Sequence, residues 1–279
     1  MNKLSLGPHP DFPFCTVVQD GDFCYTDPYP SNEQLTEYYN STYRVVRQEA
    51  PTSDYVKFMK ARAKVQADFI RDISGRNHFA SILDIGSGCG TLVAELCNDA
   101  DYLEGWEPDV TMSKYAYDHF TTSKTKFTND LFIPGEAEQK FDLITMSHVL
   151  EHVPHPAAFL SRLRTDHLSQ GGLLFIEVPN DPAWWVQIQI ERCFKGLGHV
   201  NYFTPQSLAH FLRNAHYSPL IVHTRGISVT KFSKQRAKSN TVLQRICKRL
   251  YPWTRSASNI YKNVTSNSSI YLQLIAVNN

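Results

Sequence analysis

The chain has 279 residues, of which 42% are hydrophobic and 20% are charged, and its formal net charge at pH 7 is +1. A chain of this length and composition can bury a full hydrophobic core, which excludes an intrinsically disordered protein. The sequence holds no run of 18 apolar residues and no apolar stretch of the signal-peptide type near its start. We therefore expect neither a transmembrane helix nor secretion.

Cysteine usage and the distribution of charge narrow the expectation further. None of the six cysteines forms a C-x-x-C pair, so neither a zinc ribbon nor a disulfide framework is indicated, and a cytoplasmic location is expected. From Arg192 to Asn279 there are 13 lysine and arginine residues and no acidic residue. A solvated surface would explain this bias, and so would a basic face for an anionic substrate, an anionic membrane or nucleic acid.

Residues 1–75 show little strand pattern and are predicted to form a helical N-terminal cap. Pro28 and Pro30 mark a turn, and Ser31 stands at a typical helix start. Residues 54–73 carry an apolar stripe at helical spacing. The stripe consists of Tyr55, Phe58, Met59, Val65, Phe69 and Ile73.

From about residue 80, short apolar runs alternate with amphipathic stretches. Strands are predicted at 81–85, 102–106, 141–146, 173–178, 220–224 and 270–277, and helices at 91–98, 111–120, 156–168 and 205–215. This alternation predicts an α/β domain over 76–279 with a doubly wound, mostly parallel sheet. The last strand is expected to be antiparallel, and residues 229–265 before it to be a basic insertion.

A glycine-rich turn follows the first strand of this domain. Residues 81–91 read S-I-L-D-I-G-S-G-C-G-T, so an apolar strand leads into Gly86, Gly88 and Gly90 and then into a helix. Glycine allows a sharp turn and a close approach to a ligand. Glu107 stands 21 residues after Gly86, at the end of the next strand, where an acid can bond both ribose hydroxyls. The pattern predicts a nucleoside-binding turn.

The spacing of the glycines separates two cofactors. A dinucleotide fingerprint needs G-x-G-x-x-G, but Thr91 occupies the third glycine position, which makes an NAD-dependent dehydrogenase the least favoured hypothesis. The run L-D-I-G-S-G-C-G resembles motif I of the class I S-adenosylmethionine (SAM)-dependent methyltransferases. Further runs resemble later motifs of this family in the same order over residues 80–215. They are G-W-E-P-D, F-T-N-D-L-F, F-D-L-I-T-M-S-H and G-G-L-L-F-I-E-V-P-N.

The resemblance implies a Rossmann-like seven-stranded sheet and SAM as the methyl donor. It also implies a set of cofactor-binding residues, with the acid of F-T-N-D-L-F near the adenine and one arginine of the cap at the SAM carboxylate. These residues are Asp84, Gly86, Ser87, Gly88, Gly90, Glu107, Pro108, Asp130, Leu131, Ser147 and Arg44.

The run from His148 to His152 reads H-V-L-E-H and follows the predicted strand 141–146. It matches a metalloprotease signature, which we reject because the run lies in a SAM-binding context. Three hypotheses stay open. His148, Glu151 and His152 bind a divalent metal, act as a base without metal, or only shape the loop. The ubiquinone-pathway O-methyltransferases look similar here with E-x-x-E-H and are metal-dependent, but His148 replaces their first acid.

His199 lies in the run G-L-G-H-V-N-Y-F-T-P, which resembles a segment of glycan and small-molecule methyltransferases. Since Thr204 and Pro205 are typical of a helix start, His199 would project from a loop over the substrate pocket, or serve only in packing. No Asn/Asp/Ser-Pro-Pro-aromatic run follows the strand at 141–146, which favours an oxygen acceptor over an exocyclic amine. His148, His152 and His199 are the predicted catalytic residues.

The acceptor is predicted from a weaker resemblance. The run T-D-P-Y-P-S-N-E-Q-L-T-E-Y-Y resembles the lead-in of bacterial methyltransferases of surface-polysaccharide pathways, which implies a hydroxyl of a sugar or glycan precursor. The alternatives are a quinone or other aromatic small molecule, and a nucleic-acid methyltransferase or a non-catalytic SAM-binding adaptor. Nucleic acid is less favoured, since no RNA-binding module is visible.

The basic segment 231–262 contains an apolar helical stripe made of Val242, Leu243, Ile246 and Leu250. A basic amphipathic helix of this kind can lie on an anionic membrane surface, and it can equally pack its apolar face on the domain. The first alternative predicts a peripheral location at the inner membrane surface.

Overall fold

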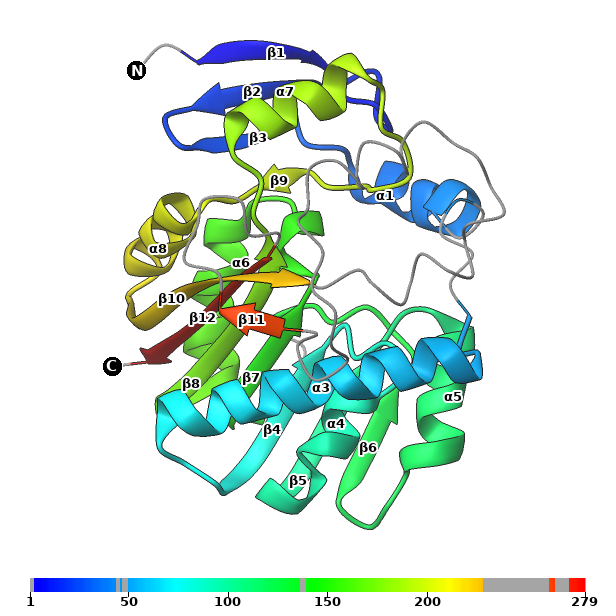
Figure 1. Ribbon diagram of the computed structural model, residues 1–279, viewed down its shortest axis with the longest axis vertical. Coiled ribbons are helices and arrows are strands. Elements are labelled where there is room, and N and C mark those ends of the chain that lie inside the picture. Colours follow the sequence, from blue (N-terminus) through cyan, green and yellow to red (C-terminus); the bar gives the residue numbers. More distant parts are fainter. Residues whose placement is uncertain are drawn as a thin grey trace.

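The computed structural model describes residues 3–43, 46, 50–135, 139–227, 261–263 and 271–278. Two sheets organise these residues (Figure 1). The larger sheet has the order β11-β10-β12-β8-β7-β4-β5-β6. Its strands are β4 (Phe79–Ile85), β5 (Ala100–Trp106), β6 (Thr125–Thr128), β7 (Phe141–Ser147), β8 (Leu168–Pro179), β10 (Tyr217–Ile227), β11 (Tyr261–Asn263) and β12 (Tyr271–Asn278).

The strands β4 to β8 are parallel, and β12 is antiparallel to both β8 and β10. This is the predicted mostly parallel, seven-stranded, Rossmann-like sheet, and the short β11 adds an eighth strand at its edge. Of the predicted insertion 229–265, only β11 falls within the described residues. The chain proceeds outward from β4 through β5 and β6, then returns to the other side at β7. Ligands of open α/β sheets bind at such a reversal, outside the carboxyl ends of the strands.

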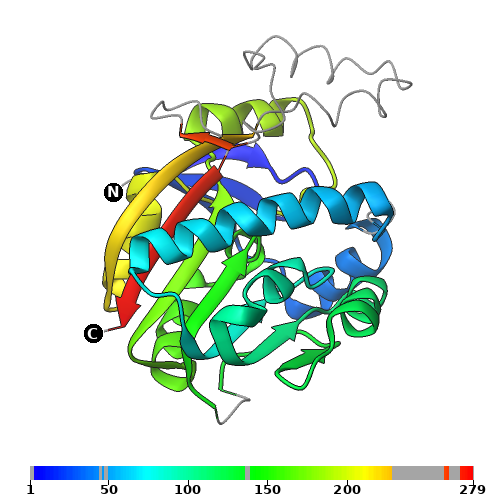
Figure 2. The ribbon, with the colours of Figure 1, turned by 60° about the horizontal axis from the view of Figure 1, so that its bottom comes forward.

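Helices cover both faces of this sheet, as Figure 2 shows for α3 on one face. On that face, Ala67, Ile70 and Leu92 pack against Leu143 and Phe175. On the opposite face, Leu160, Leu208 and Leu212 pack against strand residues such as Ile144 and Leu174. The helices are α3 (Ser53–Ser74), α4 (Thr91–Glu95), α5 (Val110–Phe120), α6 (Pro156–Arg162) and α8 (Pro205–Asn214). Burial on both faces explains why the central strands are continuous apolar runs.

All six predicted strands and all four predicted helices of this domain are present, with small shifts at their ends. The predicted helix 91–98 is α4 followed by a 3₁₀ turn at Cys97–Asp99, and the predicted helix 156–168 ends in a π-turn at Leu163–His167. Strand β6 was not predicted, because it has only four residues. Of the six residues of the apolar stripe expected in α3, Phe69 is buried and the other five are half-buried. The fully buried face of the helix is shifted from that stripe and includes Arg62 and Gln66.

The N-terminal region differs from the prediction of a helical cap. The helices α1 (Asn32–Tyr38) and α3 are present, but residues before them form β1 (Leu4–Pro8), β2 (Thr16–Asp20) and β3 (Phe23–Asp27). These strands and β9 (Asn201–Tyr202) make a four-stranded antiparallel sheet, against which α7 (Ala183–Glu191) packs (Figure 1). The sequence held one signal for these strands, the Gly21–Asp22 pair between two five-residue runs, which is typical of a hairpin turn. In the structure, Gly21 has the φ of 61° that such a turn requires.

None of the helices in the described ranges combines the length and the apolar composition needed to cross a lipid bilayer.

Candidate functional site

The glycine turn lies at the carboxyl end of β4, where the strand order reverses. Gly86, Gly88 and Gly90 have φ values of 70°, 54° and 76°, in the left-handed region that side chains disfavour. The backbone N–H groups of Gly86 and Ser87 donate to the carbonyl oxygen of Trp106, at 2.8 and 3.0 Å. A Cβ atom at Gly86 would lie 2.5 Å from Cγ2 of Val149. The turn is therefore tied to β5, and it fits closely against the residues that follow β7.

Glu107 joins this turn to the end of β5. Its Oε2 accepts a hydrogen bond from the N–H of Gly88 at 2.8 Å, and its Oε1 accepts one from Asp109 at 2.8 Å. Asn129, after β6, donates to the carbonyl oxygens of Glu107 and Pro108 at 2.9 and 3.2 Å. The structure therefore gathers the glycine turn, Glu107 and Pro108 at one edge of the sheet, as a nucleoside site requires.

Two further predicted cofactor residues lie beside this edge. Asp130 and Leu131 are exposed, and the Asp130 carboxylate accepts the N–H of Leu131 at 2.7 Å. Leu131 is 60% exposed, which leaves its side chain available to a planar ring. Arg44, the predicted carboxylate-binding residue, lies outside the described residues.

Asp84 lies under the turn and is 3% exposed. Its Oδ1 accepts a hydrogen bond from the Thr145 hydroxyl at 2.6 Å, so it links β4 to β7. Burial raises the pKa of Asp84 to about 7, against the opposing effect of the Thr145 hydrogen bond. This side chain therefore carries its proton through most of the acidic range.

Ser147 ends β7, but its hydroxyl is directed to helix α3. It accepts hydrogen bonds from Arg62 Nη2 at 3.0 Å and from Gln66 Nε2 at 2.9 Å. The Ser147 side chain thus belongs to a polar cluster between α3 and β8, and only its backbone is left for the predicted cofactor contact.

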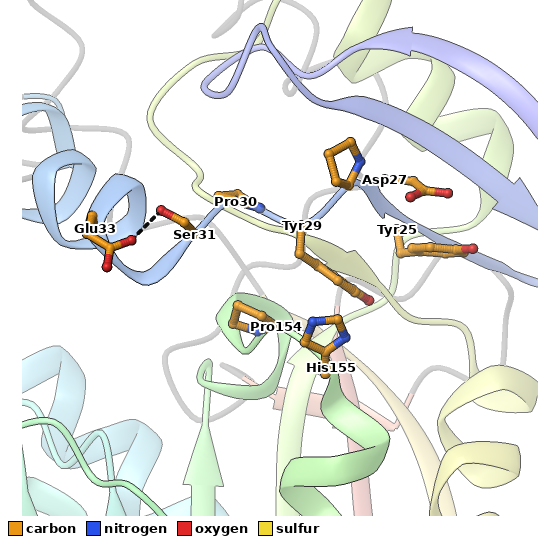
Figure 3. Close-up of a pocket in the computed structure, with 9 residues that line it drawn as sticks. Tyr25, Asp27, Tyr29, Pro30, Ser31, Glu33, Pro154 and His155 are labelled. Carbon is orange, nitrogen blue, oxygen red and sulfur yellow. Dashed lines mark hydrogen bonds between the residues drawn. The ribbon is translucent and has the colours of Figure 1, made fainter.

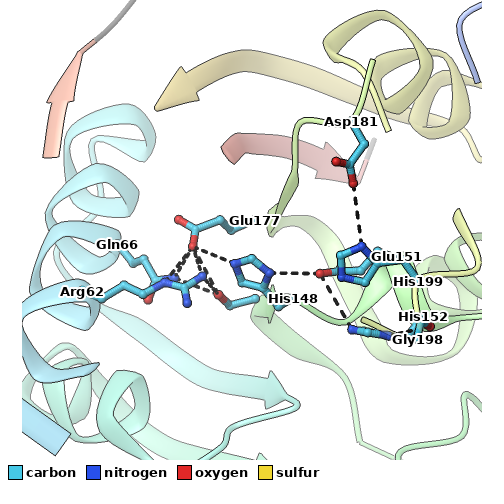
Figure 4. A network of polar contacts seen from close by, with 10 residues as sticks. Arg62, Gln66, His148, Glu151, His152, Glu177, Asp181, Gly198 and His199 are labelled. Atoms are coloured by element: carbon cyan, nitrogen blue, oxygen red, sulfur yellow. Dashed lines mark hydrogen bonds and ion pairs between the residues drawn. The ribbon is translucent and has the colours of Figure 1, made fainter. Parts of the chain in front are cut away.

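That cluster is centred on Glu177 of β8, which is 1% exposed (Figure 4). Oε1 accepts from Arg62 Nε at 2.9 Å and from Gln66 Nε2 at 3.1 Å, and a second Arg62 nitrogen forms an ion pair with it. Oε2 accepts from the side-chain amide of Gln273. Burial alone would raise the pKa of Glu177, but the Arg62 guanidinium holds it below its ordinary value. Glu177 is therefore a charged anchor within the sheet.

His148 connects Glu177 with the loop after β7. Its backbone has a φ of 58°, its N–H donates to the carbonyl oxygen of Glu177 at 2.8 Å, and its Nδ1 lies 3.0 Å from Oε1 of Glu151. Leu150–His152 form a 3₁₀ turn, but His148 lies outside it in a left-handed conformation, so a turn rather than the expected helix brings His148 to Glu151. Glu151 is 1% exposed, and its Oε2 is buried with no hydrogen-bond partner among the described residues.

His152 has a fixed tautomer. Its Nδ1 lies 3.0 Å from the carbonyl oxygen of Gly198, which can only accept, so Nδ1 carries the hydrogen. Burial lowers the pKa of His152 to about 4, so the ring is neutral at pH 7 and Nε2 bears a lone pair. That Nε2 lies 4.0 Å from Oε1 of Glu151.

The structure brings His199 to the same place. The ring centroids of His152 and His199 are 5.1 Å apart, and Nδ1 of His199 lies 3.8 Å from Oδ2 of Asp181. His199 is 8% exposed, and within the described part of the chain its Nδ1 is buried without a hydrogen-bond partner. The three predicted catalytic histidines therefore form one cluster around Glu151 (Figure 4).

The geometry changes the predicted metal set. Among the described residues, the atoms that could bind one cation belong to Glu151, His152 and His199, and they lie within 4.8 Å of one another. His148 was predicted as a ligand, but it is hydrogen-bonded to Glu151 instead and is absent from this group. One carboxylate and two imidazoles suit a divalent transition metal, and the Nδ1–H···O=C bond of His152 is of the kind that orients a ligand.

Five polar residues around Glu177 and His199 were not predicted from the sequence. They are Arg62, Gln66, Glu177, Asp181 and Gln273. A signal existed for Glu177, since a lone acid in the apolar run L-L-F-I-E-V is costly to bury unless it is paired. Its partner on α3 had no comparable signal, because an arginine in an amphipathic helix is ordinarily solvated.

A separate surface pocket lies where β3 leads into α1, opposite Pro154 and His155 (Figure 3). Its wall includes Tyr25, Asp27 and Tyr29. The Tyr29 hydroxyl donates to Oδ1 of Asn201 at 2.7 Å, and Asn201 Nδ2 donates to the carbonyl oxygens of Leu150 and Val153, at 3.3 and 2.7 Å. The pocket thus shares a wall with the loop that carries Glu151 and His152.

Comparison with known proteins adds to this geometry. A family model described as a methyltransferase domain matches residues 55–220. The ubiquinone biosynthesis O-methyltransferase of Aeromonas salmonicida (strain A449) is 26% identical over 178 residues, which cover 56% of this chain and 74% of that protein.

Two solved structures share the fold. The 1,6-didemethyltoxoflavin-N1-methyltransferase of Burkholderia thailandensis, with bound 1,6-didemethyltoxoflavin and S-adenosylhomocysteine, is 14% identical with a TM-score of 0.56; the match covers 97% of this chain and 98% of that one. The magnesium protoporphyrin IX methyltransferase of Synechocystis PCC 6803, with bound S-adenosylhomocysteine, is 13% identical with a TM-score of 0.55 and coverages of 88% and 99%.

Proposed function

Since this chain belongs to the methyltransferase-domain family and is a SAM-dependent methyltransferase, we propose that it transfers the methyl group to a hydroxyl oxygen, with His152 as the general base. The observation that carries this proposal is the hydrogen bond from His152 Nδ1 to the carbonyl oxygen of Gly198. It leaves the Nε2 lone pair as the proton acceptor of a neutral imidazole, three residues after Val149, which packs closely on the glycine turn.

The reaction is an in-line displacement at carbon. The acceptor oxygen forms a bond to the methyl carbon while the bond from that carbon to the sulfonium sulfur breaks, and S-adenosylhomocysteine leaves. A hydroxyl must also lose its proton, which His152 Nε2 would receive; Glu151, 4.0 Å from that nitrogen, would stabilise the imidazolium. Holding donor and acceptor in line can supply about 7–11 kcal/mol of the barrier.

A divalent cation is the competing way to activate the hydroxyl. Glu151, His152 and His199 would hold it, and its chemistry would be to lower the pKa of the acceptor hydroxyl. The two roles of His152 exclude each other, because a single Nε2 lone pair cannot both bind a cation and accept the proton. A chelator therefore separates them.

We propose a sugar or glycan precursor as the acceptor, in the cytoplasm, with the basic segment 231–262 resting on an anionic membrane surface. The support is the N-terminal run T-D-P-Y-P-S-N-E-Q-L and its resemblance to polysaccharide-pathway methyltransferases. The similarity to a ubiquinone O-methyltransferase supports an oxygen acceptor, and it favours a quinone as the second candidate. The fold by itself does not choose, because many acceptors share it.

The test measures methyl transfer from radiolabelled SAM to a panel of glycan precursors, quinols and amines, with and without EDTA. His152→Gln is expected to lower kcat by about 10²–10⁴-fold, the ordinary contribution of a general base, with the Kd of S-adenosylhomocysteine unchanged within about twofold. His78→Gln is the matched control, since His78 is exposed and precedes β4 at the opposite end of the sheet.

Three outcomes would contradict parts of the proposal. Methylation of amines alone would overturn the oxygen acceptor. Loss of activity in EDTA that returns with a divalent cation would replace the base by a metal. An unchanged kcat in His152→Gln would remove His152 from the chemistry.

A further inference from the structure

A turn near the N-terminus holds the loop before His199. The carboxylate of Asp11 accepts two backbone hydrogen bonds, from the N–H of Gly196 to Oδ1 at 2.7 Å and from the N–H of Gly198 to Oδ2 at 2.9 Å. Bonds from two N–H groups to one charged carboxylate are strong and directional. Asp11 therefore fixes the path of residues 196–198, although it lies 185 residues earlier in the chain.

The loop has a backbone shape suited to this carboxylate. Gly196 and Gly198 have φ values of 84° and 65°, a left-handed conformation that turns both N–H groups toward Asp11. A Cβ atom at Gly198 would lie 2.6 Å from the ring of Tyr38. The two bonds to Asp11, together called the clamp below, therefore favour glycine at both positions of G-L-G-H. The close approach of Tyr38 adds a second requirement for glycine at Gly198.

His9 adds a second contact to the same loop. Its Nδ1 accepts the N–H groups of Asp11 and Phe12, both at 3.0 Å, so Nε2 carries the hydrogen and donates to the carbonyl oxygen of His199 at 2.8 Å. His9 is 2% exposed, and the two N–H groups that Nδ1 accepts require that nitrogen to keep its lone pair. His9 therefore fixes both the turn that presents Asp11 and the backbone of His199.

The clamp reaches His152 through one residue. Gly198 is held at its N–H by Asp11, and its carbonyl oxygen accepts the hydrogen from Nδ1 of His152. The N–H of Gly198 belongs to the Leu197–Gly198 peptide and its carbonyl oxygen to the Gly198–His199 peptide, so Asp11 holds the peptide unit next to the carbonyl. If the Gly198–His199 peptide rotated once that hold was lost, the acceptor would leave Nδ1 of His152, and the ring would be free to carry its hydrogen on Nε2. The orientation of one carbonyl group thus decides which nitrogen of His152 keeps its lone pair.

We propose that Asp11 and His9 are positioning residues, which hold the Gly196–His199 loop and thereby set the tautomer of His152 and the place of His199. The tautomer stands on geometry alone; its effect on turnover rests on the proposed function of His152 as the base. The connection between β1 and β2, which carries both residues, would therefore contribute to the chemistry.

The first experiment reads the tautomer directly. Protein with ¹⁵N-labelled histidine is examined by long-range ¹H–¹⁵N correlation spectra near pH 7, with His152→Gln to assign the signal. The wild type is expected to show His152 with hydrogen on Nδ1, and Asp11→Ala a majority with hydrogen on Nε2. Asp22→Ala, an exposed acid of the same N-terminal unit, is expected to leave the spectrum unchanged.

The second experiment measures kinetics on the same proteins. Asp11→Ala is expected to lower kcat by about tenfold or more, with the KM for SAM unchanged, because the cofactor turn is separate from the clamp. Asp11→Asn keeps one acceptor oxygen, so its kcat is expected to lie between those of the wild type and Asp11→Ala. This variant is used if Asp11→Ala does not fold.

The two readouts separate this inference from the proposed function. A changed tautomer supports the clamp, and if kcat stays at the wild-type value it is the base role of His152 that fails. A folded Asp11→Ala protein in which His152 keeps its hydrogen on Nδ1 overturns the clamp, whatever its kcat.

Discussion

The glycine turn at the end of β4 and the polar cluster around Glu151 and Glu177 are held together in different ways. At the cofactor edge, Gly86 and Ser87 bond to Trp106, and Glu107 bonds to Gly88, so its contacts join segments about 20 residues apart. In the polar cluster around Glu151 and Glu177, Asp11 bonds to Gly198 and Arg62 pairs with Glu177. These contacts join residues 187 and 115 positions apart in the sequence. A local site depends on backbone shape, whereas a long-range site depends on paired buried charges. The two should therefore fail under different substitutions.

The largest effect is expected from breaking the buried charge pair. Glu177→Gln removes the carboxylate charge opposite the Arg62 guanidinium, whose side chain is 10% exposed, which costs roughly 3–5 kcal/mol of unfolding free energy. Chemical denaturation measures this. Asp118→Asn breaks the exposed Lys114–Asp118 pair and should cost less than about 0.5 kcal/mol. Equal losses in the two variants would show that the cluster is no anchor.

The next effect concerns Asp84 and depends on pH. Because burial raises its pKa to about 7, the folded protein keeps a proton that the unfolded chain releases above its ordinary pKa of 3.8. Its contribution to stability is therefore present below pH 3.8 and is lost as the pH rises to about 7.

Asp84→Asn removes this loss. The variant should be more stable than the wild type above pH 7 by roughly 2–4 kcal/mol, and the difference should shrink toward pH 4. Unfolding curves of both proteins across pH 4–8 give that difference, in which the other carboxylates cancel. A difference that does not vary with pH would mean that Asp84 is already ionised in the folded protein.

The smallest change in stability is expected at the glycine turn, although it affects function strongly. Gly86→Ala places a methyl group 2.5 Å from Val149 at a φ of 70°, at a cost of about 1–3 kcal/mol, and should weaken binding of S-adenosylhomocysteine by about tenfold or more. Gly88→Ala has the same backbone strain but meets no atom within 4 Å, so it isolates the contact with Val149. Calorimetric titration compares the two, and equal affinities would assign the whole effect to backbone strain.

The same contrast explains what the sequence could predict. Gly86, Gly88, Gly90 and Glu107 lie in a contiguous pattern whose spacing is set by one strand–turn–helix unit, and the structure gathers them as expected. The pairing of Arg62 with Glu177 cannot be read from spacing, because the acid stands out in its apolar strand but nothing in the sequence points to an arginine 115 residues earlier. For the same reason, the motif around His199 predicted a loop over the substrate pocket but not the position of His199 beside His152, and only coordinates add His199 to the residues that could hold a cation.

The strand pairing of β3 with β9 has a consequence for how the protein is made. Cys24 pairs with Tyr202, so the N-terminal sheet stays open until the chain has been synthesised past residue 202. Closing so long a loop adds entropy cost and slows folding, and domains form while the ribosome is still adding residues. The nascent chain therefore contains the whole glycine turn before it can join the N-terminal sheet to the loop that carries His199, and β12, which lies between β8 and β10, is added to the large sheet later still.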